Sequence, residues 1–121
     1  MASTVAQQVL TDSDRLEVAL GIAKRWHLRD RETQALLGVP ARTFYRWKGH
    51  LARLHPDQRA RASHLANIDL ALEAVFDNAG AAQTWLRQPN ASFNERTPLA
   101  VMIDDGFAGI LRVRTYLERL L

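Results

Sequence analysis

The sequence predicts an all-α protein in which an N-terminal helix-turn-helix is followed by a small second helical domain. Apolar residues recur at three- and four-residue steps along nearly the whole chain, as on one face of a helix. No segment alternates apolar with polar residues long enough to form a strand. Near residue 38, a glycine and a proline separate two short amphipathic segments, as in a helix-turn-helix. We expect a flexible N-terminal segment (1–11), a helix-turn-helix domain (12–61) and a second domain (62–121).

The first helix is predicted to begin at Thr11, Asp12 or Ser13, whose side chains can cap a helix, and to end near His27. Its apolar stripe comprises Leu16, Ala19, Leu20, Ala23 and Trp26.

The helix-turn-helix follows directly. Asp30 is placed to cap a short helix through Leu37, after which Gly38 can adopt the left-handed conformation that a turn requires. Pro40 fixes the backbone that enters the recognition helix, predicted from about Ala41 to His50. This helix should place Phe44, Trp47 and Leu51 inward and Arg42, Tyr45 and Arg46 outward.

Pro56, near the end of the first domain, suits the first turn of a longer helix, and residues 62–78 continue a helical pattern that joins the two halves. Its apolar residues are Leu65, Ile68, Leu72, Val75 and Phe76. We expect residues 78–80 to end it, and a short helix through Trp85 and Leu86 to stop before Pro89. Residues 90–96 should form an ordered loop.

Thr97 and Pro98 are predicted to start another helix, with Leu99, Met102 and Ile103 inward. We expect Gly106 and Gly109 to interrupt the pattern, and Asp104 to cap a final helix from about Phe107. The apolar side of that helix comprises Ile110, Val113, Leu117, Leu120 and Leu121.

Positive charge is concentrated in the middle of the chain. Residues 21–61 hold ten Lys or Arg against three acidic residues, whereas residues 1–20 and 62–121 each carry a net charge of −2. A basic segment that contains a helix-turn-helix favours contact with nucleic acid over a merely solvated surface. We therefore expect DNA-binding residues on the recognition helix, namely Arg42, Thr43, Tyr45, Arg46 and Lys48, with Arg42 and Arg46 nearest the base edges. The candidates for phosphate contacts are Lys48, Arg53, Arg59 and Arg61.

Residue types that would support other functions are absent or scattered. The chain has no cysteine, and its four histidines show no spacing typical of metal ligands. No activated nucleophile or phosphate-binding glycine loop is recognisable, so we predict no enzyme activity, metal or cofactor.

Trp26, Trp47 and Trp85 lie on apolar stripes and are predicted core residues. Without an export signal or a membrane span, a cytoplasmic location is the simplest expectation.

Several motifs together resemble those of Xre/MbcA/ParS-type antitoxins over about residues 12–121. The N-terminal part of the resemblance is Leu36-Leu37-Gly38-Val39-Pro40 with Arg42-Thr43 and Tyr45-Arg46-Trp47. The C-terminal part comprises Trp85-Leu86, Pro89-Asn90, Thr97-Pro98-Leu99, Met102, Gly106, Gly109, Arg112-Val113-Arg114 and Tyr116-Leu117. The sequence departs from common family patterns at Gln34 and Pro40, and at Asn94-Glu95, where relatives often have glycine.

The resemblance implies an Xre-like helix-turn-helix domain, a toxin-binding domain, and a type II antitoxin that inhibits a RES-domain toxin acting on NAD or transferring ADP-ribose. It also implies repression of the antitoxin's own promoter, as a homodimer or within a toxin-antitoxin hetero-oligomer. Because the C-terminal end of some relatives enters the toxin's active site, the candidate toxin-binding residues are Arg112, Arg114, Arg119, Leu120 and Leu121. The three arginines have an equally plausible role in keeping the last helix soluble. The alternative function is a stand-alone helix-turn-helix regulator with no toxin partner.

Overall fold

The computed structural model describes residues 10–47 and 51–121, which contain seven α-helices, one 3₁₀ helix and no strand. The helices are α2 (Asp12–Arg25), α3 (Asp30–Leu37), α4 (Ala41–Trp47), α5 (Pro56–Val75), α6 (Ala79–Leu86), η1 (Ala91–Phe93), α7 (Pro98–Asp104) and α8 (Gly106–Arg119). The predicted all-α fold is therefore confirmed. Among the described residues, no helix combines the length and the apolar character needed to cross a bilayer.

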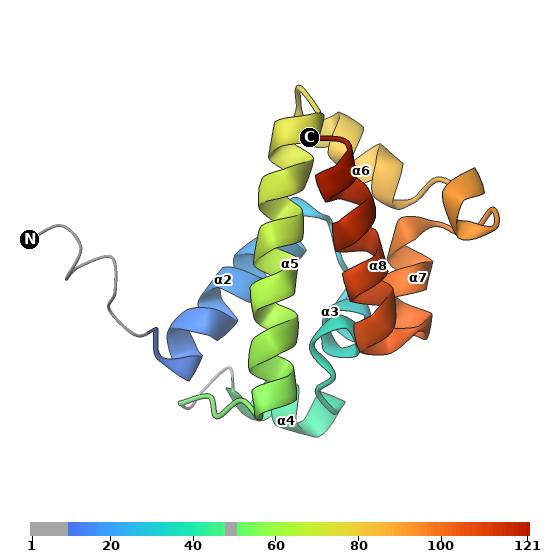
Figure 1. Cartoon of the computed structure of the whole chain (residues 1–121). Helices are drawn as coiled ribbons and strands as arrows, with labels where there is room; N and C mark the ends of the chain where they lie inside the picture. Colours follow the sequence, from blue (N-terminus) through green and yellow to red (C-terminus); the bar gives the residue numbers. More distant parts are fainter. Residues whose placement is uncertain (1–9, 48–50) are drawn as a thin grey trace, which may run out of the picture.

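Helix α5 is the axis of the molecule, and the other helices pack around it (Figure 1). Helix α2 lies against one side and α8 against another, while α7 packs behind α8. Helices α5 and α8 run in the same direction, from the end where α4 lies to the end where α6 begins. The two ends of α5 therefore present different surfaces, one formed by the helix-turn-helix and one formed by the last part of the chain.

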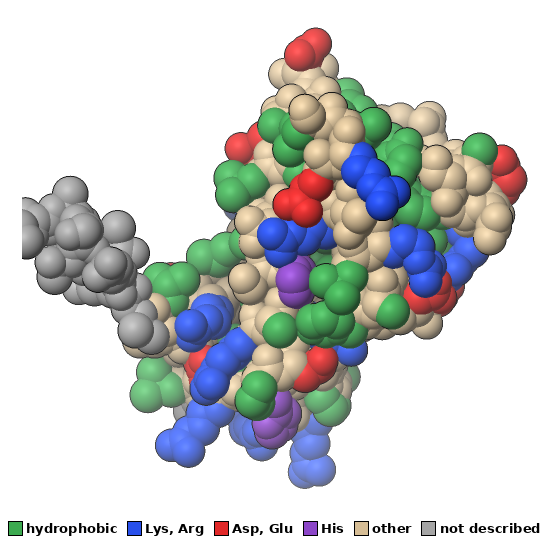
Figure 2. All heavy atoms as spheres, viewed as in Figure 1, with side chains coloured by type: hydrophobic (Ala, Val, Ile, Leu, Met, Phe, Trp, Pro, Cys, Tyr) green, Lys and Arg blue, Asp and Glu red, His purple; other side chains and the backbone are tan. Residues whose placement is uncertain are grey.

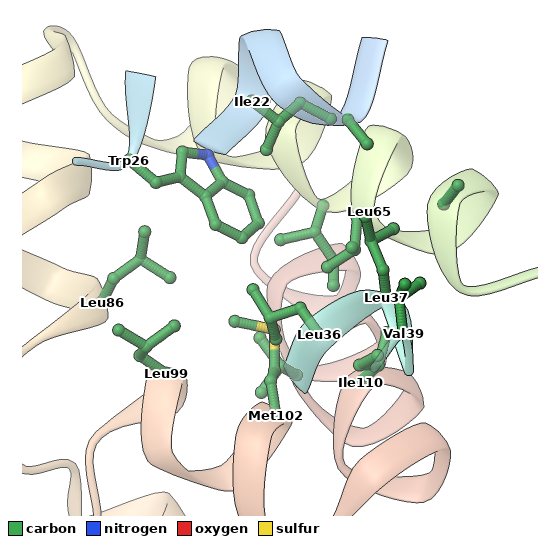
Figure 3. Packing of buried hydrophobic residues seen from close by; sticks show 14 of the residues in the cluster. Ile22, Trp26, Leu36, Leu37, Val39, Leu65, Leu86, Leu99, Met102 and Ile110 are labelled. Carbon is green, nitrogen blue, oxygen red and sulfur yellow. The ribbon is translucent and has the colours of Figure 1, made fainter. Parts of the chain in front are cut away.

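One continuous hydrophobic core joins both halves of the chain (Figure 3). Trp26 from α2 and Leu36 from α3 point toward Met102 of α7 and Ile110 of α8, and all four side chains are buried. The Trp26 indole donates a hydrogen bond of 2.9 Å to the buried Asp69 carboxylate on α5. Arg25 donates to the same carboxylate at 2.6 Å, so the buried charge is paired and hydrogen-bonded.

The helix boundaries confirm several expectations from the local sequence. Thr11 caps α2, with its hydroxyl accepting from the Asp14 amide at 3.0 Å. Thr97 caps α7 in the same way, with Pro98 in the first turn. Pro56 likewise occupies the first turn of α5. Trp26 and Trp47 are buried core residues, and Trp85 is partly buried against the core, as predicted.

Other boundary predictions were wrong. Asp30 does not cap α3. Arg29 holds that position, and the Glu32 carboxylate accepts from its amide at 2.8 Å. Residues 78–80 begin a helix instead of ending one, because the Asn78 side chain accepts from the Ala81 amide and so caps α6. Asn and Gly favour both starts and stops of helices, so the sequence pattern did not distinguish them.

The prediction for the last two helices needs three corrections. Gly106, with φ of 63°, marks the break between α7 and α8 as predicted, whereas Gly109 lies within α8 and does not interrupt it. Asp104 ends α7, and the N-cap position of α8 belongs to Asp105, whose carboxylate binds arginines and not the helix amides. The buried face of α8 stops at Leu117, because the helix ends at Arg119 and leaves Leu120 and Leu121 exposed.

One predicted inward residue is placed differently, because Leu51 is 84% exposed and belongs to no described helix. Ile103, also predicted to face inward, is partly buried and packs against the core. The first helix ends at Arg25, and His27 adopts a left-handed conformation with φ of 55°.

Candidate functional site

The turn between α3 and α4 has the geometry predicted for a helix-turn-helix. Gly38 has φ of 67° and ψ of 40°, and the following Val39 amide donates to the Gln34 carbonyl at 2.9 Å. A Cβ atom at Gly38 would also lie 3.2 Å from the Arg61 Nε atom. Both the backbone conformation and the neighbouring arginine therefore favour glycine at this turn.

Helix α4 is held by two aromatic side chains and exposes the opposite face. Phe44 and Trp47 are 2% and 6% exposed, as predicted, and pack in the common core. Arg42, Tyr45 and Arg46 are exposed, whereas Thr43 is half-buried. Of the predicted DNA-binding residues, Arg42, Tyr45 and Arg46 therefore form one exposed face. Lys48 lies outside the described residues.

The described arginines near α4 divide into exposed and internally paired side chains. Arg42, Arg46 and Arg53 form no ion pair with another described residue. We call these three residues, together with Tyr45, the α4 surface. Figure 2 shows Lys and Arg side chains gathered at the lower end of the molecule, where Figure 1 places α4. No acidic residue belongs to α4 itself.

Arg59 and Arg61, two of the predicted phosphate contacts, have structural partners. Arg59 binds both oxygens of Asp12 at 2.9 and 3.2 Å, and this hydrogen bonding lowers the pKa of the Asp12 carboxyl. Arg61 binds Asp57 at 2.9 Å, and its guanidinium also lies over the Phe107 ring. A phosphate contact by either arginine would have to compete with these interactions, which leaves Arg53 as the least encumbered candidate.

Tyr45 is oriented by a contact between the two helices of the motif. Its hydroxyl donates to the Asp30 carboxylate at 3.0 Å, although the side chain remains 51% exposed. The ring also meets Phe44 edge-on, with centroids 5.5 Å apart. Asp30 therefore positions a residue of the recognition helix, a role that the sequence prediction of a cap had missed.

A groove lies between α8 and the segment around η1. We call it the C-terminal groove, and it has a volume of about 770 Å³. Its lining residues are Ser92, Phe93, Ala108, Leu111, Arg112, Thr115, Tyr116, Arg119 and Leu120. Leu111 and Leu120 are 37% and 51% exposed, and the adjacent Leu121 is 65% exposed. An open groove with exposed leucines at its edge is typical of a protein-binding surface.

Four aromatic rings form a connected support beneath this groove. Trp85 stacks on Tyr116 with centroids 5.9 Å apart, and Phe93 meets the other side of Tyr116 at 5.2 Å. Phe76, at the end of α5, packs against Trp85 at 6.0 Å. The rings connect the end of α5 to α6, α8 and η1, so the groove is formed by parts of the chain already fixed by packing.

The structure separates the five residues predicted to bind a toxin. Arg112, Arg119 and Leu120 line the C-terminal groove, and Leu121 follows directly. Arg114 points elsewhere, since its guanidinium donates to the His64 ring at 2.7 Å and to Glu118 at 3.3 Å. Sequence reasoning missed Leu111, which interrupts the polar face of α8, and Tyr116, whose partial exposure depends on where η1 lies.

A small ion network fixes the loop beside the groove. Arg96 donates to both oxygens of Asp105 at 2.9 and 3.1 Å, and Arg112 donates to the same carboxylate at 2.9 Å. These bonds hold the pKa of the Asp105 carboxyl below its ordinary value. The described residues contain no group of three or more His, Cys, Asp or Glu side chains arranged to hold a metal ion.

Two family models together match nearly the whole chain. Residues 7–67 match the antitoxin Xre-like helix-turn-helix domain, and residues 71–121 match the antitoxin Xre/MbcA/ParS C-terminal toxin-binding domain. The chain belongs to the Xre/MbcA/ParS antitoxin family. The two matches meet inside α5, so one helix contributes to both domains of this family member. Our predicted division at residue 61 also falls within α5 and stays a prediction.

Two individual proteins are similar to this chain over most of its length. The chain is 38% identical over 104 residues to the uncharacterized protein y4oB of Sinorhizobium fredii, covering 85% of this chain and 81% of that protein. Its structure is also similar to a chain in the crystal structure of the M. tuberculosis MbcT-MbcA toxin-antitoxin complex. That match has a TM-score of 0.59 and 23% identity, and it covers 85% of this chain and 89% of the other, which establishes a shared fold.

Proposed function

We propose that this family member inhibits a RES-domain toxin through the C-terminal groove and represses its own promoter through the α4 surface. The observation that carries the proposal is that the α4 surface lies at the end where α5 begins, whereas the C-terminal groove runs along α8 beside η1 (Figure 1). They share no residue, so one partner can bind without covering the surface for the other. A chain with this fold occurs in the MbcT-MbcA toxin-antitoxin complex.

Toxin inhibition requires no catalytic group on the antitoxin, because covering the substrate cleft is sufficient. The exposed Leu111, Leu120 and Leu121 supply apolar contacts, while Arg119 supplies a charged group at the same edge. The family resemblance implies a toxin that degrades NAD or transfers ADP-ribose. Although residues 62–121 carry a net charge of −2, the groove itself is lined by Arg112 and Arg119 and by no acidic residue among those described, so it would complement acidic groups on the toxin.

On DNA, the α4 surface would lie in the major groove. Arg42 and Arg46 are exposed and form no ion pair with residues 10–47 or 51–121, so their guanidinium groups can reach base edges, where a guanidinium matches the two acceptors of guanine. Arg53 is suited to a phosphate contact, which would set position without reading sequence. Paired half-sites on the promoter would be bound by a homodimer.

Variants at the two surfaces test the two activities separately. Leu120→Glu with Leu121→Glu should abolish toxin neutralisation and co-purification when the chain is co-expressed with the adjacent gene product, while promoter binding persists. Arg42→Ala and Arg46→Ala should each weaken promoter binding by about 1–3 kcal/mol while neutralisation persists. Each pair of variants is the control for the other, because both surfaces are exposed and neither change removes a core contact.

The results also separate the alternative functions. Toxicity of the adjacent product that persists with the wild-type chain, without a complex, would contradict the antitoxin proposal. Intact promoter binding in that experiment would instead support a stand-alone helix-turn-helix regulator. A neutralised product without NAD-consuming or ADP-ribosylating activity would contradict only the assignment of the toxin class.

A further inference from the structure

One polar contact on the α4 surface joins the two helices of the helix-turn-helix. Tyr45 lies in α4, and its hydroxyl donates to the carboxylate of Asp30, the first residue of α3, at 3.0 Å. The Tyr45 ring also meets the buried Phe44 ring edge-on. The ring and the hydroxyl are thus held by two separate contacts, while the Tyr45 side chain stays exposed.

The contact with Asp30 fixes the direction in which the Tyr45 hydroxyl can form a further hydrogen bond. A tyrosine hydroxyl carries one proton, and a carboxylate only accepts. Because the proton is given to Asp30, the Tyr45 oxygen can only accept from a group on the DNA. The guanidinium groups of Arg42 and Arg46 on the same face can only donate. The exposed face of α4 therefore combines donors with an acceptor of fixed polarity.

This polarity decides between the two kinds of DNA group that the hydroxyl could meet. Tyrosine hydroxyls commonly contact phosphates, to which they donate. Here a phosphate oxygen would face an accepting oxygen that is itself bonded to a carboxylate, so the contact would be repulsive. A base amino group donates and suits the same oxygen. In the major groove only adenine, at N6, and cytosine, at N4, present such a donor.

We propose that Tyr45, positioned by Asp30, reads an amino base, adenine or cytosine, at one position of the operator and rejects the keto bases guanine and thymine there. The inference rests on the proposed promoter binding and deepens it, because it assigns a base preference to a defined side chain. Arg42 and Arg46 would read guanine at other positions. Asp30 is a positioning residue, because it acts on the DNA only through Tyr45.

Selection from a duplex DNA library with a randomised segment tests the assignment, and the fragment upstream of the gene is the second probe. Wild type should select A or C at one position on one strand, and replacing that base by G or T should weaken binding about tenfold. Tyr45→Phe should bind the same site without this preference, because phenylalanine keeps the ring and lacks the oxygen. Asp30→Ala should also lose the preference, because the hydroxyl can then donate to a keto base as well as accept.

The Asp30 substitution separates positioning from a merely structural role. Removing a negative charge beside the α4 surface should leave the average affinity for DNA equal to that of wild type or higher, while the base preference is lost. A structural defect would instead weaken binding to every sequence. Arg42→Ala is the matched control on the same face, since it should weaken binding but keep the preference for an amino base at the Tyr45 position. Circular dichroism melting confirms that each variant is folded.

A base analogue tests the wild-type chain without any substitution in the protein. Replacing the selected adenine by purine, or the selected cytosine by 2-pyrimidinone, deletes only the amino group. This deletion should weaken binding by wild type about tenfold more than binding by Tyr45→Phe. The comparison with Tyr45→Phe removes any effect that the analogue has on the duplex itself.

The outcomes distinguish this inference from the proposed function. An unchanged base preference in Tyr45→Phe would overturn the inference, and so would a uniform loss of affinity for all sequences, which would indicate a phosphate contact. A preference that survives in Asp30→Ala would overturn the positioning by Asp30. If wild type selects no sequence and does not bind the upstream fragment, promoter binding itself fails and the inference fails with it. A wild type that selects a site without using Tyr45 overturns the inference alone.

Discussion

Helices α4 and α8 each bury one face and expose another, but they are attached to the molecule in different ways. Helix α8 packs against both α5 and α7, and its Ile110, Val113 and Leu117 side chains are completely buried. Helix α4 packs mainly against α3 and is anchored in the core by Phe44 and Trp47. The groove side thus depends on close packing along a whole helix, whereas the α4 surface depends on two large side chains.

Helices α7 and α8 approach each other closely at Gly109. A Cβ atom at Gly109 would lie 2.1 Å from the Val101 carbonyl oxygen. Only a movement of backbone atoms could relieve this clash. We expect Gly109→Val to lower the free energy of unfolding by at least about 4 kcal/mol, because it overpacks a helix contact that cannot expand. Urea denaturation followed by circular dichroism measures this change.

Gly21→Ala is the control, since it also replaces a helical glycine but meets only ordinary contacts. It should raise stability by about 0.5–1 kcal/mol at a concentration where the chain is monomeric. Equal destabilisation by both substitutions would show that helix propensity, and not the crossing with α7, is what matters at residue 109.

At the other end, Phe44→Ala removes one of the two anchors of α4. We expect a loss of about 3 kcal/mol in unfolding free energy, because a buried aromatic side chain is deleted and a cavity remains. Tyr45→Phe, on the same helix, removes only an exposed hydroxyl contact and should cost much less. If DNA affinity survived Phe44→Ala unchanged, the proposed dependence of the α4 surface on its aromatic anchors would be wrong.

The loop beside the groove offers a stabilising substitution. Asn94 and Glu95 have φ angles of 57° and 65°, a left-handed conformation that glycine adopts more easily than glutamate. The family resemblance led us to expect glycine here, and these φ angles supply a physical reason. Glu95→Gly should raise the free energy of unfolding by up to about 1 kcal/mol. If urea denaturation shows no rise in the free energy of unfolding, the greater conformational entropy of glycine in the unfolded chain cancels the relief of backbone strain.

The smallest expected change in stability is its pH dependence, which comes from His64 at the contact between α5 and α8. Partial burial, together with the positive charge of Arg114 at 2.7 Å, lowers the pKa of the His64 imidazole, while Glu118 opposes this effect and Phe107 packs edge-on. Because the unfolded chain then binds a proton more readily, stability should fall as the pH drops below the ordinary histidine pKa of about 6.5 and should level off below the lowered value.

Urea denaturation at pH 7.5 and 5.5 should therefore show a smaller difference for His64→Gln than for wild type, while the exposed His55→Gln retains the full difference. Asp12 and Glu32 do not interfere in this range, because the pKa values of their carboxyls are lowered from values that already lie below it. An unchanged pH response in His64→Gln would assign the titration to another group.

The features that sequence predicted well depend on local periodicity. The inward residues of α2 and α8, the two aromatic anchors of α4 and the left-handed Gly38 all follow from spacing within one element. The features it missed depend on what another element places nearby. Gly109 is a packing position only because α7 crosses there, and the pairing of Arg59 with Asp12 joins residues that are distant in the chain.

The same limit applies to the candidate surfaces. The outward face of α4 followed from helical phase, so Arg42, Tyr45 and Arg46 could be named together. The C-terminal groove needs the relative position of α8 and η1, which no spacing within the chain provides. Sequence alone therefore grouped Arg114 with Arg112, although the structure turns Arg114 toward His64.

Since α5 runs unbroken through both family matches, it sets the angle between whatever binds at its two ends. Each helical residue turns the chain by about 100° and advances it by about 1.5 Å. Inserting one residue midway along α5 would therefore turn its second half by about 100° and break the core that both halves share. The unbroken register of this one helix thus holds the two proposed binding surfaces at a fixed angle to each other.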